Sequence, residues 1–419
     1  MRATIAGAAV ALLAAACGSG GSGSSGPQTR TVLVDYRHDE VETSMFDYFP
    51  RRLAVRPGDT VEFKQAWTGE PHSVTMGTFV DEKIKPLIEL FDRVTREGKL
   101  PEGEPEEFAA FGQALPFAFG EAGMAQNAAQ PCYVDAAGFD GKYPGDEKTP
   151  CAKRPQPAFN GRQAIYNSGV IPYEGVGGNT FTVKLADDLA PGTYTYYCNV
   201  HGPLQYGQLA VQEKGTDIPS RAEVARQARA EAEKRTAPLL RNFRAAKQGS
   251  VVQGGDAGEV KIDAGKSNLI GVPTPIFADQ QLVHGIVNEF VPEELEARVG
   301  QKVTWTFTGG HTISFNVPKY FPVFTVAKDG TVEYNRKAQE PAGGWPDRPK
   351  PPGAEHDREG PPPPPVKVDA GPWDGRGFRS TGLNYQDQDE FSVTFTRAGT
   401  YDYACLIHPQ MVGKVVVRS

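Results

Sequence analysis

Two short segments of this 419-residue sequence each combine a cysteine, a histidine three residues later and a long side chain with a weak donor atom just beyond. The segments contain Cys198, His201 and Gln205, and Cys405, His408 and Met411. One thiolate and two imidazoles in a trigonal arrangement, with a distant Met or Gln donor, form a type 1 (blue) copper site. Each segment lacks the second imidazole, which we expect from upstream: His72 in the first half and His311 in the second.

The axial donor of the first site has alternatives. Gln205 stands one residue further from its histidine than Met411 does, so Leu204, Met76 or no axial ligand at all compete with it. Three other histidines have no second donor at metal spacing, and we expect them to be solvated or structural: His38, His284 and His356.

The segments that must position these residues occur twice. The matching stretches are 48–63 with 289–305, 179–185 with 390–396, 191–198 with 398–405, and 207–211 with 413–417. In the first pair, apolar and polar residues alternate on both sides of Gly58 and of Gly300, which predicts a strand, a turn and a strand. Short alternating strands with Gly and Pro turns indicate an antiparallel β-sandwich, and the pattern predicts two of them.

Both halves resemble cupredoxins of the plastocyanin/azurin type. The resemblance covers about residues 30–79 and 160–215, and about 280–316 and 385–419. It is closest where Met411 is followed by Val-Gly-Lys-Val-Val-Val, which is similar to the plastocyanin-like ending. Stellacyanin-like members use Gln where this chain has Gln205. The resemblance implies an all-β chain of two Greek-key cupredoxin domains, residues 30–215 and 258–419, with a type 1 copper ion in each.

Each predicted domain carries a long insertion. In the first, about 78–161, residues 81–97 predict a helix with Leu87, Ile88, Phe91 and Val94 on one face. Four phenylalanines follow, which we expect to fold over the sandwich as a lid: Phe108, Phe111, Phe117 and Phe119. The second insertion, about 318–387, is rich in proline and charge, so we expect irregular or extended chain there.

Residues 216–257 predict a helical linker between the domains. Ser220 and Glu223 form a capping box, and Gly249 suits the helix end. Pro238 is expected to kink or divide the helix, because proline lacks the backbone donor and clashes with the preceding turn.

Residues 1–17 have the pattern of an export signal, with Arg2 followed by an apolar run that ends at Cys17. The end of this run resembles a bacterial lipoprotein box, which implies that Cys17 is lipidated. The alternative is an ordinary secretory signal cleaved near Ala16. Residues 18–29, mostly Gly and Ser at first, then predict a flexible tether. We expect the protein outside the cytoplasm, anchored to the outer face of the cell membrane, or periplasmic or secreted.

Cys132 and Cys151 are the two cysteines left over, and they flank a loop rich in Gly, Pro and Asp. In an oxidising compartment such a pair is expected to form a disulfide. The alternative is two free thiols.

The formal net charge of −7 without a basic stripe argues against a nucleic-acid partner. Two-domain copper enzymes of the nitrite-reductase and small-laccase kinds resemble this architecture, but they connect a blue-copper Cys to a second copper through an adjacent His. Neither Cys198 nor Cys405 has a neighbouring His, and the chain contains no His-x-His pair. We therefore expect an electron carrier and not an enzyme.

The predicted function is electron transfer by two type 1 copper sites that cycle between Cu(I) and Cu(II), with redox proteins of the cell envelope as partners. Gln donates more strongly to Cu(II) than Met, so the Cys198 site is expected to have the lower potential and to pass electrons to the Cys405 site. Three alternatives remain: a copper scavenger or storage protein, a single-copper carrier whose first domain is a docking module, and an oxidase or reductase with a further copper at a subunit interface.

Overall fold

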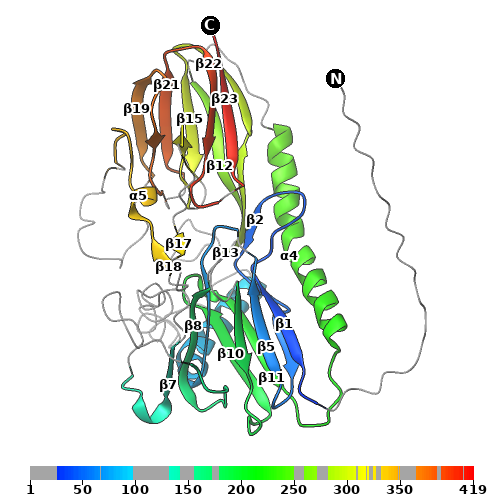
Figure 1. Ribbon diagram of the computed structural model, residues 1–419. Coiled ribbons are helices and arrows are strands. Elements are labelled where there is room, and N and C mark those ends of the chain that lie inside the picture. Colours follow the sequence, from blue (N-terminus) through cyan, green and yellow to red (C-terminus); the bar gives the residue numbers. More distant parts are fainter. Residues whose placement is uncertain are drawn as a thin grey trace, which may run out of the picture.

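The structure is a computed structural model (Figure 1). It describes residues 26–66, 68–97, 132–141, 155–171, 179–249, 259–270, 282–307, 310–317, 319, 324–326, 332–347, 349, 365–384, 388–408 and 410–419. The predicted signal segment, Cys17, Cys151, His356 and the four phenylalanines of the predicted lid lie outside these residues.

Two sheets pack face to face in the first half of the chain, which we call the first β unit. One sheet has the order β3-β1-β5-β9, with β1 (Thr29–Val34), β3 (Tyr48–Phe49), β5 (Thr60–Gln65) and β9 (Thr180–Lys184). The other has the order β4-β11-β10-β6-β8-β7, with β4 (Arg52–Val55), β6 (His72–Met76), β7 (Cys132–Asp135), β8 (Gln163–Ile171), β10 (Gly192–Cys198) and β11 (Gly202–Val211). Every second residue of β1 and β5 is buried, so one face of each strand lines a shared core.

The second β unit has the same kind of core between two further sheets. One has the order β19-β21-β15-β12-β13-β2, with β2 (Thr43–Met45), β12 (Glu259–Ile270), β13 (Leu282–Val291), β15 (Lys302–Phe307), β19 (Lys367–Trp373) and β21 (Glu390–Phe395). The other has the order β14-β23-β22-β16-β20, with β14 (Glu294–Arg298), β16 (Ser314–Phe315), β20 (Arg379–Ser380), β22 (Gly399–Ala404) and β23 (Val412–Arg418).

The two units share a pattern of parallel and antiparallel neighbours. β1 runs parallel to β5 as β12 does to β15, and β4 runs parallel to β11 as β14 does to β23. The last two strands of each unit form an antiparallel pair, β10 with β11 and β22 with β23. Each candidate ligand loop connects the two strands of that pair, which gives both loops the same structural setting.

The units are joined by more than a linker. β2 belongs to the first half of the chain, yet it pairs antiparallel with β13 in a sheet of the second unit. Helix α4 (Arg221–Gly249) lies against β1 and β3 on one side and β12 and β13 on the other, along the edge of both units in Figure 1. Its buried Ala232 and Leu239 share a cluster with Met45 and Val287. Helix α4 therefore packs on both units.

Helix α4 begins as predicted but is not divided. The Ser220 hydroxyl accepts the Glu223 N–H at 3.3 Å, and the Glu223 carboxylate accepts the Ser220 N–H at 2.7 Å. The helix continues through Pro238, so of the two predicted effects, a kink or a division, the division does not occur. Packing of residues on both sides of the proline, including Ala232 and Leu239, stabilises a single helix despite the missing hydrogen bond.

The first insertion contains the predicted helix. A π-helical turn η1 (Val80–Ile84) leads into α1 (Lys85–Glu97), and Leu87, Ile88 and Phe91 are buried against Tyr197 and its neighbours on the outer face of the sheet. A 3-10 turn η2 (Ala136–Gly138) follows β7. No helix among the described residues is long and apolar enough to cross a membrane.

The second insertion contains regular elements. It contains β17 (Phe324–Val326), β18 (Val332–Tyr334), the short helix α5 (Arg336–Gln339), β19 and β20. The strands are extended chain, one of the two forms predicted for this insertion, whereas the short helix α5 was not predicted. β19 tolerates Pro372 because it is an edge strand, and its register with β21 shifts between Asp369 and Pro372.

Candidate metal centres

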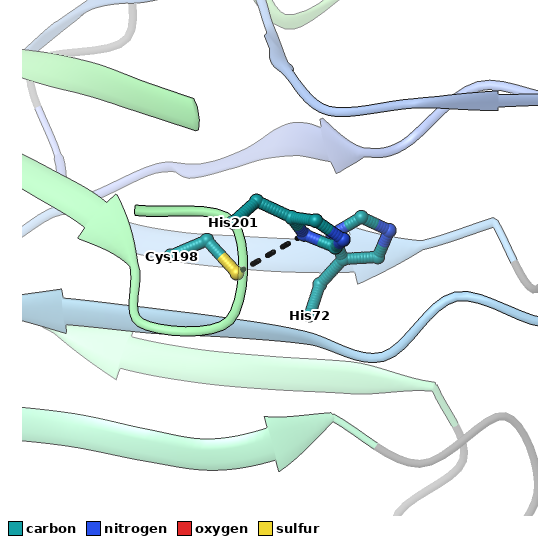
Figure 2. Close-up of side chains that lie close together, drawn as sticks. All are labelled: His72, Cys198 and His201. Atoms are coloured by element: carbon teal, nitrogen blue, oxygen red, sulfur yellow. Dashed lines mark hydrogen bonds between the residues drawn. The ribbon is translucent and has the colours of Figure 1, made fainter. Parts of the chain in front are cut away.

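The first candidate site lies where β6, β10 and β11 meet at one end of their sheet. β6 begins at His72 and β10 ends at Cys198, while His201 lies in the short connection to β11. The Cys198 Sγ is 3.6 Å from the His201 Nδ1, and one donor atom from each of the three residues lies within 4.8 Å of the others. Figure 2 shows the sulfur directed at the two rings.

Gln205 completes the first site with an oxygen. Its Oε1 is 2.9 Å from the Nδ1 of His72 and 2.9 Å from the Nδ1 of His201. Its Nε2 donates to the Asp47 carbonyl at 3.3 Å, and this fixes which end of the amide faces the histidines. The oxygen is therefore available as a fourth donor.

The competing residues pack differently. Leu204 packs against the cluster that contains α1, and Met76 lies in the core between the two sheets, four residues along β6 from His72. The geometry therefore favours Gln205.

The second candidate site repeats this arrangement. Cys405 follows β22, and its Sγ is 3.9 Å from the Nδ1 of His311 and 3.5 Å from the Nδ1 of His408. The two Nδ1 atoms are 3.1 Å apart. Met411 closes the loop, because its carbonyl accepts the Cys405 N–H and its own N–H donates to the His408 carbonyl. The Met411 side chain is buried in the same core cluster as Cys405.

Both sulfurs receive a backbone donor from the residue that follows the upstream histidine. The Ser73 N–H donates to the Cys198 Sγ at 3.3 Å, and the Thr312 N–H donates to the Cys405 Sγ at 3.4 Å. A thiolate with two imidazole nitrogens facing it is a donor set that suits copper. The residues present at both sites thus fit a type 1 copper ion.

The electrostatics of both sites favour the thiolate. Burial raises the pKa of Cys198 and of Cys405, but hydrogen bonds and positive charge from the neighbouring histidines outweigh it and hold both pKa values well below the usual range. Burial lowers the pKa of His72, whereas the Asp35 carboxylate and the Cys198 sulfur raise it to about 10. The thiolate is the form that binds a metal ion.

Asp35 is a site residue that the sequence analysis missed. Its Oδ2 lies 3.1 Å from the Nε2 of His72 and accepts the Thr68 hydroxyl at 2.6 Å. A carboxylate on one ring nitrogen fixes the imidazole orientation and leaves the other nitrogen for the metal. In the sequence, Asp35 is only a charged residue directly after a strand, and nothing nearby distinguishes it.

Glu70 is the second residue that was missed. One carboxylate oxygen is 3.1 Å from the Nε2 of His408, and the other is 3.6 Å from the Nε2 of His201. Burial raises the pKa of Glu70, but hydrogen bonds and charge from the two histidines lower it well below its usual range. One sequence signal could have found it. Glu70 lies two residues before His72, whereas the second half has glycine at the corresponding position before His311.

The remaining predicted residues have separate surroundings. His38 is half-buried, and its Nδ1 accepts the Glu40 N–H at 3.0 Å, which fits the predicted structural role. The side chain of His284 lies outside the described residues. Cys132 is buried in β7, and because Cys151 is outside the described residues their pairing stays a prediction.

Comparison with known proteins finds a local similarity. No protein-family model matches the chain. Amicyanin from Paracoccus denitrificans is 63% identical over 37 residues, which are 9% of this chain and 28% of amicyanin. A reduced Cu(I) form of an amicyanin mutant is 25% identical with a TM-score of 0.14, covering 30% of this chain and 70% of that chain. A purple cupredoxin from Nitrosopumilus maritimus is 19% identical with a TM-score of 0.17, covering 38% and 98%.

Both TM-scores are too low to bear on the fold. The similarity to amicyanin is local, since the chain spans little more than a quarter of that protein. Its identity of 63% over that stretch supports a cupredoxin-like family for this chain.

Proposed function

We propose that this chain is an electron-transfer protein with two type 1 copper sites. The ligands of the first are His72, Cys198, His201 and Gln205, and those of the second are His311, Cys405, His408 and Met411. The observation that carries the proposal is the convergence of one thiolate and two imidazoles at each of two equivalent strand ends. The match to amicyanin, a protein with a Cu(I) form, supports the same function.

Bound copper would supply a one-electron couple between Cu(I) and Cu(II). The protein holds the donors in place from several strands: backbone N–H groups orient both sulfurs, and Asp35 orients His72. Donors fixed in this way need little rearrangement when the charge of the site changes. Cys198, Cys405 and His311 are fully buried, which keeps water and substrates away from the donors.

The wider setting is part of the proposal. The two β units are two domains of a duplicated cupredoxin fold, and α4 is the strap between them. The chain works outside the cytoplasm, where lipidated Cys17 tethers it to the membrane and redox proteins of the cell envelope exchange electrons with it. Cys132 and Cys151 form a disulfide in that compartment.

Copper content and spectra test the proposal. The purified chain is expected to hold two copper ions, and its oxidised form should show two type 1 signals in electron paramagnetic resonance together with intense visible absorption from thiolate-to-copper charge transfer. One equivalent of copper would favour a single-copper carrier. A type 2 signal would point to an enzyme, and tight Cu(I) binding without rapid electron exchange would point to storage.

The order of the two potentials is a second test. The first site should have the lower potential, because Gln205 donates through oxygen and the Asp35 carboxylate lies next to His72. We expect Asp35→Asn to raise the first potential by tens of millivolts, since a tenfold change in the equilibrium corresponds to about 59 mV for one electron. The reduction potential of the second site should be the same in Asp35→Asn as in the wild type.

Redox titration of both sites measures this effect. The control is Asp188→Asn, which removes the same charge from a carboxylate that is 65% exposed and paired with Arg162. A first-site potential above the second in the wild type would contradict the order, and an unchanged potential in Asp35→Asn would contradict the role of Asp35.

A further inference from the structure

Glu70 lies between the two candidate copper sites. It belongs to the connection between β5 and β6, and its side chain is 17% exposed, compared with 13% for His201 and 2% for His408. One carboxylate oxygen is 3.6 Å from the His201 Nε2, and the other is 3.1 Å from the His408 Nε2. A single carboxylate therefore contacts one proposed ligand of each site.

Both histidines are oriented in the same way toward this carboxylate. In His201 and in His408 the Nδ1 faces the cysteine of its own site, and the Nε2 faces Glu70. A continuous chain of contacts thus runs from Cys198 through His201, Glu70 and His408 to Cys405. Its steps measure 3.6, 3.6, 3.1 and 3.5 Å.

The loop that carries Glu70 lies in close contact with the second unit. Gly69 has a φ of +104°, and a Cβ at this position would lie 2.3 Å from the Ile407 carbonyl oxygen and 2.8 Å from the His408 ring. Only glycine fits such a contact without displacing the loop. The Glu70 carbonyl accepts the Gln65 side-chain amide at 2.9 Å, which fixes the backbone on the other side.

We infer that Glu70 is the link between the two copper sites, a positioning residue that holds His201 and His408 together and provides the route for electrons between them. The inference rests on the proposed function. The first site loses one electron and is thereby oxidised. The second site gains this electron and is thereby reduced. No bond forms or breaks, and Glu70 keeps its contacts throughout. A reduced envelope protein supplies the electron to the first site, and an oxidised one removes it from the second.

Two substitutions remove the charge of Glu70 together with one or both of its bridging contacts. Glu70→Gln keeps the shape but offers one acceptor oxygen and one NH₂ donor, so it satisfies only one of two facing N–H groups. Glu70→Ala removes both contacts. The control Glu89→Gln makes the same change of charge at a carboxylate that is 67% exposed on α1.

The experiment uses the full copper-loaded chain and measures the rate of electron transfer between the sites after rapid reduction of one of them. We expect both Glu70 variants to slow this rate about 10- to 100-fold. This is the factor by which loss of a residue that supports metal ligands typically lowers metal affinity or activity. The control should keep the wild-type rate. Copper content and the two type 1 signals are expected to persist in all variants, which a general loss of structure would not allow.

A metal-free measurement keeps the test independent of copper loading. In the metal-free wild type, the proton on the His408 Nε2 should be protected from solvent exchange in NMR spectra, and Glu70→Ala should lose this protection. A wild-type rate in Glu70→Ala with both coppers bound would overturn the link and leave the proposed function standing. A wild-type chain that fails to bind two coppers would overturn the proposed function and the link with it.

Discussion

Cys198→Ser is expected to remove one of two type 1 copper signals, and Cys405→Ser is expected to remove the other. Each sulfur is fully buried and faces two imidazole nitrogens, so no other side chain of its site supplies a thiolate. A serine hydroxyl is a harder ligand that stays protonated, and it does not give the charge-transfer absorption of a copper thiolate. Each variant should therefore lose about half of the type 1 intensity per chain.

Visible absorption and electron paramagnetic resonance of the copper-loaded variants measure the loss. Each single variant is the matched control for the other, because it makes the same chemical change at the equivalent buried cysteine of the other site. We expect each variant to keep the signal of the unchanged site. The assignment of two separate sites would be wrong if either single variant lost both signals or kept both.

The ligand loops could be predicted because their information is local. A cysteine at the end of one strand and a histidine in the short connection to the next must lie close together whatever the rest of the chain does. The upstream histidines required more, namely the repeated strand pattern that places His72 and His311 at equivalent points of the two halves. The structure brings each of them to its cysteine.

The residues that support the ligands could not be predicted in the same way. Asp35 and Glu70 act through contacts with partners that are distant in sequence, and a carboxylate in a loop is ordinarily just a solvated group. The placement of β2 in the sheet of the second unit is also non-local, since three residues carry too little pattern to identify a partner strand. Only the packing of the two units creates these contacts.

Composition left the local structure open in two places. Proline and charge predicted irregular or extended chain in the second insertion, and β19 is an extended strand at a sheet edge, where a missing backbone donor is tolerated. Pro238 predicted a kink or a division of the helix, and the packing of Ala232 and Leu239 against both units stabilises one undivided helix. In both cases tertiary contacts decided between the local possibilities.

The core positions Phe63 and Trp305 should be the most sensitive to truncation. They stand at equivalent places in β5 and β15, and both side chains are fully buried. Phe63 packs edge-on against Tyr196 with ring centroids 4.9 Å apart, and Trp305 packs edge-on against Tyr403 at 5.5 Å. Truncation of a buried aromatic residue to alanine costs about 3–5 kcal/mol of the free energy of unfolding. We expect a loss of this size in Phe63→Ala and in Trp305→Ala.

Urea denaturation of the metal-free chain, followed by circular dichroism, measures both losses. Val299→Ala is the control, because this side chain is 41% exposed and its loss should change stability by about 0.5 kcal/mol or less. The two units should also unfold together, since β2 pairs with β13 and α4 packs on both units. Each core variant is therefore expected to shift a single transition. Two separate transitions, of which Trp305→Ala moves only one, would show that the strap and the shared sheet do not couple the units.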